Sequence, residues 1–113
     1  MNKEIMSLVD KRTKKALNNA IIEWTSETDI GGDLNLYSMF NQIICSIHIS
    51  SSCIVFSDKW DDTEETKKQT RIFINNYTGR KNSVSTQQIK SWIKSGCSDT
   101  DNYYKESYEI VTN

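Results

Sequence analysis

Apolar residues in the first part of the chain recur at helical spacing. Between residues 3 and 24 most of them fall three, four or seven positions apart, and Lys and Asn occupy many of the positions between. An apolar stripe of this period indicates an amphipathic helix, so we predict a helix over 3–24. Its inner face would hold Ile5, Val9, Ala16, Leu17, Ala20, Ile21 and Trp24. Two adjacent glycines, Gly31 and Gly32, lie in the acidic segment that follows and predict a loop there.

The apolar pattern over residues 34–57 fits two different structures. Ile43, Cys45, Ile47 and Ile49 alternate as in a strand, and the β-branched content from Ile43 onward favours a strand. Residues 50–52 are all serine and suit a turn before the short apolar run 53–56, which predicts a central hairpin. Residues 34–40 would form a short helical or extended entry. The alternative is a second helix over 34–48, with a stripe of Leu36, Phe40, Ile43, Ile44 and Ile47.

The C-terminal half of the chain carries helix start and stop signals. Acidic residues from Asp61 to Glu65 precede Lys67 and Lys68, which suits a helix start, and Gly79 suits its end. A second, short helix is predicted from a cap at Ser85 or Thr86 through Lys94, with Gly96 as its stop. Residues 99–113 form either a last helix capped near Ser98 or a polar tail that ends in an edge strand.

These elements predict one small globular domain over 1–113 with an α+β, mostly helical fold. It would consist of the N-terminal helix, the central short β-hairpin and then two or three C-terminal helices. A chain of 113 residues can bury one hydrophobic core. Only 36 % of the residues are apolar, so the three Trp, five Tyr and three Phe are expected to supply much of the buried area.

Composition indicates where such a protein would act. No apolar run approaches the roughly 18 residues of a membrane span, and the N-terminus lacks the pattern of a signal peptide. Three cysteines, an odd number, suit reduced thiols rather than disulfides. We therefore expect a cytoplasmic location, or the host cytoplasm if the protein is viral. The absence of proline and the abundance of Asn, Ile and Lys suggest an AT-rich source such as a phage or mobile element.

A helix-turn-helix-like segment over 71–95 is the main argument for nucleic-acid binding. Its side chains could contact phosphates and base edges: Arg80, Lys81, Gln87, Gln88, Lys90 and Lys94. The turn of about six residues exceeds the usual three or four. With 14 basic against 15 acidic residues, the chain also has no basic surplus. We therefore keep a small DNA-binding transcriptional regulator as the alternative function.

A second basic stretch runs over residues 10–15. Its lysines Lys11, Lys14 and Lys15 could contact phosphate or an acidic partner. A solvated helix face is the simpler interpretation.

Candidate chemistry is sparse. His48 and Cys45 could form a base–nucleophile pair on a helix, but on a strand they point to opposite faces, and no orienting carboxylate is evident nearby. A structural zinc requires four soft ligands, and the chain offers Cys45, His48, Cys53 and Cys97. A second closely spaced pair of ligands is missing among them. We therefore predict no enzymatic activity, no metal site and no cofactor.

The function we favour is binding to another protein. Acidic and aromatic residues interleave near the C-terminus, as in a surface that meets a basic partner: Asp99, Asp101, Tyr103, Tyr104, Glu106 and Tyr108. A phage or mobile-element inhibitor, an immunity-type protein or an adaptor fits this description. A nucleic-acid-processing enzyme would suit as the partner, and no membrane is implicated.

Overall fold

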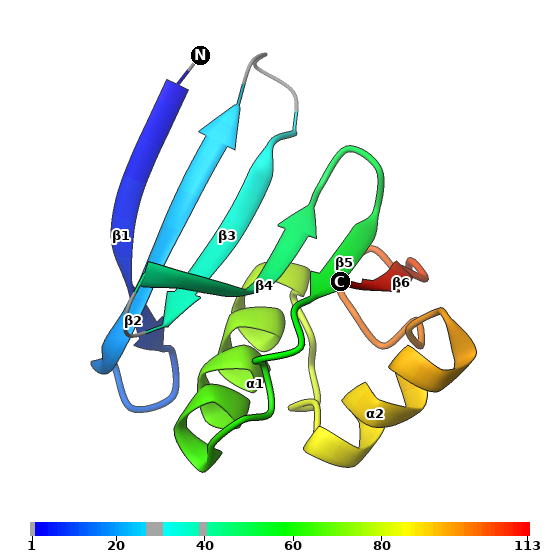
Figure 1. The fold of residues 1–113 in the computed structure, drawn as a ribbon. Coiled ribbons are helices and arrows are strands. Elements are labelled where there is room, and N and C mark those ends of the chain that lie inside the picture. Colours follow the sequence, from blue (N-terminus) through cyan, green and yellow to red (C-terminus); the bar gives the residue numbers. More distant parts are fainter. Residues whose placement is uncertain (1, 27–30, 39–40) are drawn as a thin grey trace.

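A six-stranded mixed sheet forms the centre of the computed structural model, which describes residues 2–26, 31–38 and 41–113 (Figure 1). The strands lie side by side in chain order: β1 (Asn2–Asp10), β2 (Lys15–Ser26), β3 (Asp33–Ser38), β4 (Gln42–His48), β5 (Cys53–Phe56) and β6 (Glu109–Thr112). Strands β1 to β5 are antiparallel to their neighbours, and β6 runs parallel to β5. Two helices, α1 (Glu64–Thr78) and α2 (Thr86–Ser95), cover one face of the sheet.

The predicted N-terminal helix is wrong, because residues 3–24 form the antiparallel strands β1 and β2. Residues 10–15 contain no apolar side chain, and they form the end of β1, the turn and the start of β2. Lys14 and Asn19 have φ angles of 61° and 57°, which a right-handed helix excludes. Along β2, Ala20, Ile22 and Trp24 alternate toward the helices, so the pattern over these residues has a period of two.

The predicted central hairpin is confirmed as β4 and β5, in which His48 pairs with Cys53 and Cys45 pairs with Phe56. The entry at 34–38 is extended and belongs to β3, which pairs with both β2 and β4. The alternative helix over 34–48 is therefore wrong. Phe40, part of the stripe that suggested it, lies outside the described residues.

Both predicted C-terminal helices are formed, and their ends are close to the predicted ones. Thr63 caps α1 through a reciprocal hydrogen-bonded box with Thr66, and Ser85 caps α2 in the same way. Gly79 and Gly96 end the two helices in the left-handed region, as their positions indicated. There is no last helix between residues 98 and 113. This segment is a loop followed by β6, which corresponds to the edge-strand alternative.

The predicted mostly helical fold is wrong, because the described residues form six strands and two helices. One hydrophobic core lies between the sheet and the two helices. Its fully buried members include Leu8, Ile22, Leu36, Ile47, Ile54 and Phe56 from the sheet and Phe73, Ile74 and Ile89 from the helices. Among the described residues, no helix has the length and apolar character that crossing a membrane requires.

Candidate functional site

A loop between Ser98 and Tyr108 connects α2 to β6, and its own hydrogen bonds hold its shape. The Ser98 backbone N–H donates to the Tyr108 carbonyl at 2.9 Å, and the Tyr108 N–H donates to Ser98 Oγ at 2.8 Å. Between these two residues, the Asn102 side-chain amide donates to the Glu106 carbonyl at 2.7 Å and accepts from the Glu106 N–H at 3.0 Å. The hydroxyl of Ser52 also donates to the Glu106 carboxylate, which ties the loop to the turn before β5. We call residues 98–108 the C-terminal loop.

Arg80 fixes the C-terminal loop to the end of α1. Its guanidinium donates to Asp99 at 2.6 Å and lies 3.6 Å from an Asp101 carboxylate oxygen, while only 2 % of its side chain is exposed. The same guanidinium lies 5.2 Å from the centre of the Trp92 ring, in a cation–π contact. Burial alone would raise the pKa of Asp99, but hydrogen bonds from Arg80 and from the Asp101 backbone outweigh it, and the pKa is lowered.

Two tyrosines project from this fixed loop into solvent. Tyr103 and Tyr104 are each 75 % exposed, and their rings meet edge to face with centres 4.9 Å apart. The Tyr103 N–H donates to the Thr78 carbonyl at the end of α1. Gly79 lies so close to Tyr103 that an added Cβ would come within 2.7 Å of the tyrosine Cβ. We call Tyr103 and Tyr104 the tyrosine pair.

The predicted partner-binding residues differ in how far they are exposed and in what they contact. Only the tyrosine pair is strongly exposed. Tyr108 belongs to the core, and Asp99, Asp101 and Glu106 bond other parts of the chain. Sequence reasoning could not separate these six positions, because the loop contacts that distinguish them connect residues far apart in the chain.

The predicted nucleic-acid-binding residues are divided in the same way. Arg80 is buried in its ion pairs, and the Gln88 side chain accepts from the Ser85 N–H in the cap of α2. Exposed positions of the set are Lys81, Gln87, Lys90 and Lys94. The ion pairs of Arg80 and its contact with the Trp92 ring give this side chain a role in holding the fold together.

His48 has an orienting carboxylate that the sequence analysis missed. Its Nδ1 lies 2.7 Å from Oδ1 of Asp33 on the neighbouring strand β3. The pairing of β3 with β4 creates this contact, so only a correct strand register could have indicated it. Cys45 points into the core, away from His48, so the two do not form the base–nucleophile pair that was considered.

Neither thiol near His48 is activated. Cys53 pairs with His48 across β4 and β5, but burial and then the charge of Glu109 raise the pKa of the Cys53 thiol. Burial raises the pKa of Cys45 as well. A thiol with a raised pKa is a poor nucleophile near neutral pH. In the described part of the chain, no three His, Cys, Asp or Glu side chains are placed to hold a metal ion.

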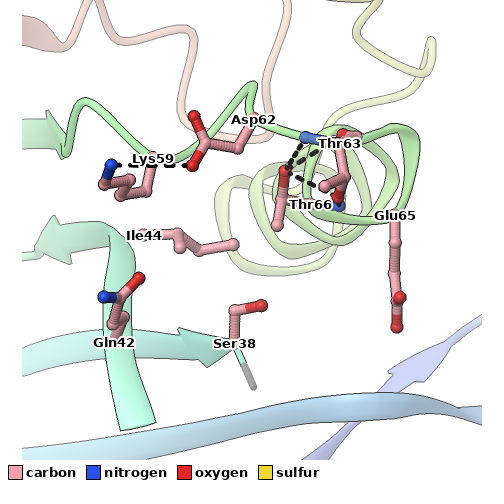
Figure 2. A pocket seen from close by; sticks show the side chains of 8 residues that line it. All are labelled: Ser38, Gln42, Ile44, Lys59, Asp62, Thr63, Glu65 and Thr66. Carbon is pink, nitrogen blue, oxygen red and sulfur yellow. Dashed lines mark hydrogen bonds and ion pairs between the residues drawn. The ribbon is translucent and has the colours of Figure 1, made fainter. Parts of the chain in front are cut away.

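A hollow of about 230 Å³ opens beside the first turn of α1, between that turn and strands β3 and β4 (Figure 2). Thr63 and Thr66 bond each other there in the capping box. Lys59 Nζ lies 3.8 Å from an Asp62 carboxylate oxygen. These groups serve the start of the helix, as expected for carboxylates and hydroxyls at a helix N-terminus. We therefore assign the hollow a structural role.

Comparison of the chain with protein-family models, with curated protein sequences and with solved structures finds no match. The functional argument consequently rests on the geometry of the molecule itself.

Proposed function

We propose that this protein acts by binding another protein and that the tyrosine pair lies at the centre of the contact. The observation that carries the proposal is the exposure of Tyr103 and Tyr104 on a loop that internal hydrogen bonds hold in place. Tyrosine is enriched among the residues that dominate binding energy at protein interfaces. A loop that is already ordered loses little conformational entropy on binding.

The proposed contact is aromatic rather than acidic. Arg80 neutralises one of the two carboxylate charges of Asp99 and Asp101 and holds both side chains in place, so they offer a basic partner less than two free carboxylates would. The raised pKa values of Cys45 and Cys53 make these two thiols poor candidates for a nucleophile. All three cysteines are free thiols, which supports a reducing compartment such as the cytoplasm as the proposed location.

Affinity capture with paired variants tests the proposal. The chain is immobilised and exposed to extract from the cell that makes it, in parallel with the Tyr103→Ala/Tyr104→Ala variant. The control is Ile5→Ala/Ile21→Ala, which removes exposed apolar side chains from the uncovered face of the sheet. We expect a protein bound by the wild type and the control but retained at least about 100-fold less by the tyrosine variant, because hot-spot residues contribute about 2 kcal/mol or more each. Equal retention by the tyrosine variant, with its circular dichroism unchanged, would refute the proposal.

A further inference from the structure

The two basic stretches of the sequence, at 10–15 and 80–83, meet at one place in the structure. A hollow of about 170 Å³ lies between the β1–β2 turn and the C-terminal end of α1. Lys11 and Arg12 line it from the turn, and Lys81 and Ser83 line it from the segment after α1. We call this the basic hollow. Some 70 residues separate its two sides in the chain, so the sequence alone did not indicate it.

Hydrogen bonds hold the two sides of the basic hollow together. The Asn76 side chain donates to the Val9 carbonyl at 2.7 Å, and Lys11 Nζ donates to the Asn76 carbonyl at 3.3 Å. Within the turn, the Arg12 N–H donates to the Asp10 carboxylate at 2.9 Å, and the Lys14 N–H donates to the Asp10 carbonyl at 2.7 Å. The cations are thus presented by ordered backbone.

Positive charge is concentrated here although the whole chain has a net charge of -1. Of the charged side chains that line the hollow, Asp10 is the one carboxylate, against Lys11, Arg12, Lys81 and Arg80. Arg80 is engaged by Asp99 and Asp101, so the hollow itself presents Lys11, Arg12 and Lys81 against Asp10. One carboxylate charge of Asp99 and Asp101 is left over, and it lies in a neighbouring hollow that Lys81 and Lys105 also line. Lys14 and Lys15 continue the same turn and are exposed, so the basic surface extends beyond the hollow.

The negative end of the α1 dipole accounts for only part of this cluster. The last turn of α1 contains no basic residue, and Lys11 bonds one of its carbonyls, so Lys11 has a structural role there. Within the described residues, the side chains of Arg12 and Lys81 form no hydrogen bond or ion pair with the rest of the chain. The helix dipole therefore does not account for the placement of Arg12 and Lys81 at this hollow.

We infer that the basic hollow binds a phosphate group of a nucleic-acid strand. A guanidinium and an ammonium that face one small space suit the geometry of a phosphate, and the Ser83 hydroxyl is a further donor. A single free phosphate would leave Lys14 and Lys15 unused, whereas a strand can place neighbouring phosphates along the turn. Contacts of this kind hold the backbone and carry no base specificity. None of the residues that line the hollow belongs to α2 or to the tyrosine pair.

Fluorescence anisotropy of labelled single-stranded and duplex DNA tests the inference, at about 50 and about 200 mM salt. The variant is Arg12→Glu/Lys81→Glu, and the control with the same change of charge is Lys90→Glu/Lys94→Glu on α2. For three phosphate contacts on a single strand we expect binding about 20-fold weaker at the higher salt. We expect the hollow variant to lose binding and the α2 control to keep most of it.

Three results would overturn the inference: no binding at about 50 mM salt, binding that the hollow variant retains, or binding that only the α2 control loses. Polyglutamate is added as a competitor at the same total concentration of negative charge as the DNA. If it displaces the DNA, the hollow binds acidic proteins instead. Should the charge reversals disturb folding, Arg12→Gln and Lys81→Gln replace them. Amide chemical shifts during titration with pyrophosphate give a second test. Changes confined to residues 10–12, 75–76 and 81–83 support the site, and changes elsewhere contradict it.

Discussion

Arg80 shows how one buried side chain can organise a surface. Its guanidinium connects the end of α1 to the C-terminal loop through Asp99 and to α2 through the Trp92 ring. Replacing a hydrogen-bonded partner of a buried charge leaves that charge uncompensated, which is costly. Arg80 and Lys81 are adjacent basic residues, and no local pattern distinguishes them. Burial assigns Arg80 to the fold, whereas Lys81 is exposed and can take part in the proposed phosphate site.

The Asp99→Asn variant should be less stable than the wild type near pH 7, by about 1–2 kcal/mol. Hydrogen bonds to charged groups contribute about 1.5–3 kcal/mol, and the partial exposure of Asp99 reduces this figure. Asp101→Asn should cost less, because its oxygen lies farther from Arg80, at 3.6 Å. Urea unfolding of the two variants and the wild type measures both differences.

The Asp99 effect should depend on pH in one direction. The pKa of Asp99 is lower in the folded protein than its ordinary value of 3.8. As the pH falls below that value, the unfolded chain takes up a proton that the folded protein does not, so the stability from the charged Asp99 declines. The difference between wild type and Asp99→Asn should be constant from about pH 7 to about pH 5 and shrink below about pH 4. A difference that grows with acidity would contradict the assigned contact.

At the scale of elements, the two helices end alike but in different surroundings. Gly79 and Gly96 have φ angles of 66° and 83°. The backbone of any residue other than glycine is strained in this left-handed region. An added Cβ at Gly79 would press on Tyr103, whereas one at Gly96 would meet no atom within 4 Å. The end of α1 therefore also positions the tyrosine pair.

Gly79→Ala and Gly96→Ala form a matched pair that separates backbone strain from this contact. Gly96→Ala should cost about 1–2 kcal/mol, the penalty for a left-handed alanine. Gly79→Ala should cost about 1–3 kcal/mol more, as overpacking does, and should shift the aromatic NMR signals of Tyr103 and Tyr104. Equal unfolding free energies for the two variants would mean that the C-terminal loop moves away without cost.

Elements with local signals could be predicted from the sequence, and those without could not. Caps and terminal glycines are neighbours in the chain of the helices they delimit, so both helices were placed within a few residues. The first 26 residues lacked such signals. Their apolar positions fit a helical stripe as well as two alternating strands. The structure has the two strands, in which Met6 pairs with Ile22 across the turn. The sites depended still more on long-range contacts, since Asp33–His48 and the basic hollow require the finished fold.

At the scale of the whole molecule, β6 completes the sheet by a pairing that no local pattern could indicate. Ile54 and Ile110 are register partners in a parallel pair, although both helices lie between them in the chain. The outer side of β6 is occupied by residues 96–98, since the Ile110 N–H donates to the Gly96 carbonyl at 3.0 Å. The strand thus connects the sheet, the end of α2 and the C-terminal loop.

The stability of the whole molecule should therefore depend on the inward side of this short strand. Ile110 is buried toward the helices, while its neighbour Val111 is half-buried on the other face of the sheet. Ile110→Ala should lower the free energy of unfolding by about 2–5 kcal/mol, as removal of a buried isoleucine does. Val111→Ala should cost clearly less, because part of its surface remains in water in the folded state. Urea unfolding followed by tryptophan fluorescence, with hydrogen exchange of the β5 amides, would measure both. If β6 pairs only weakly with β5, both variants would instead lose a small and equal amount of unfolding free energy. Hydrogen exchange of the β5 amides would then be unchanged.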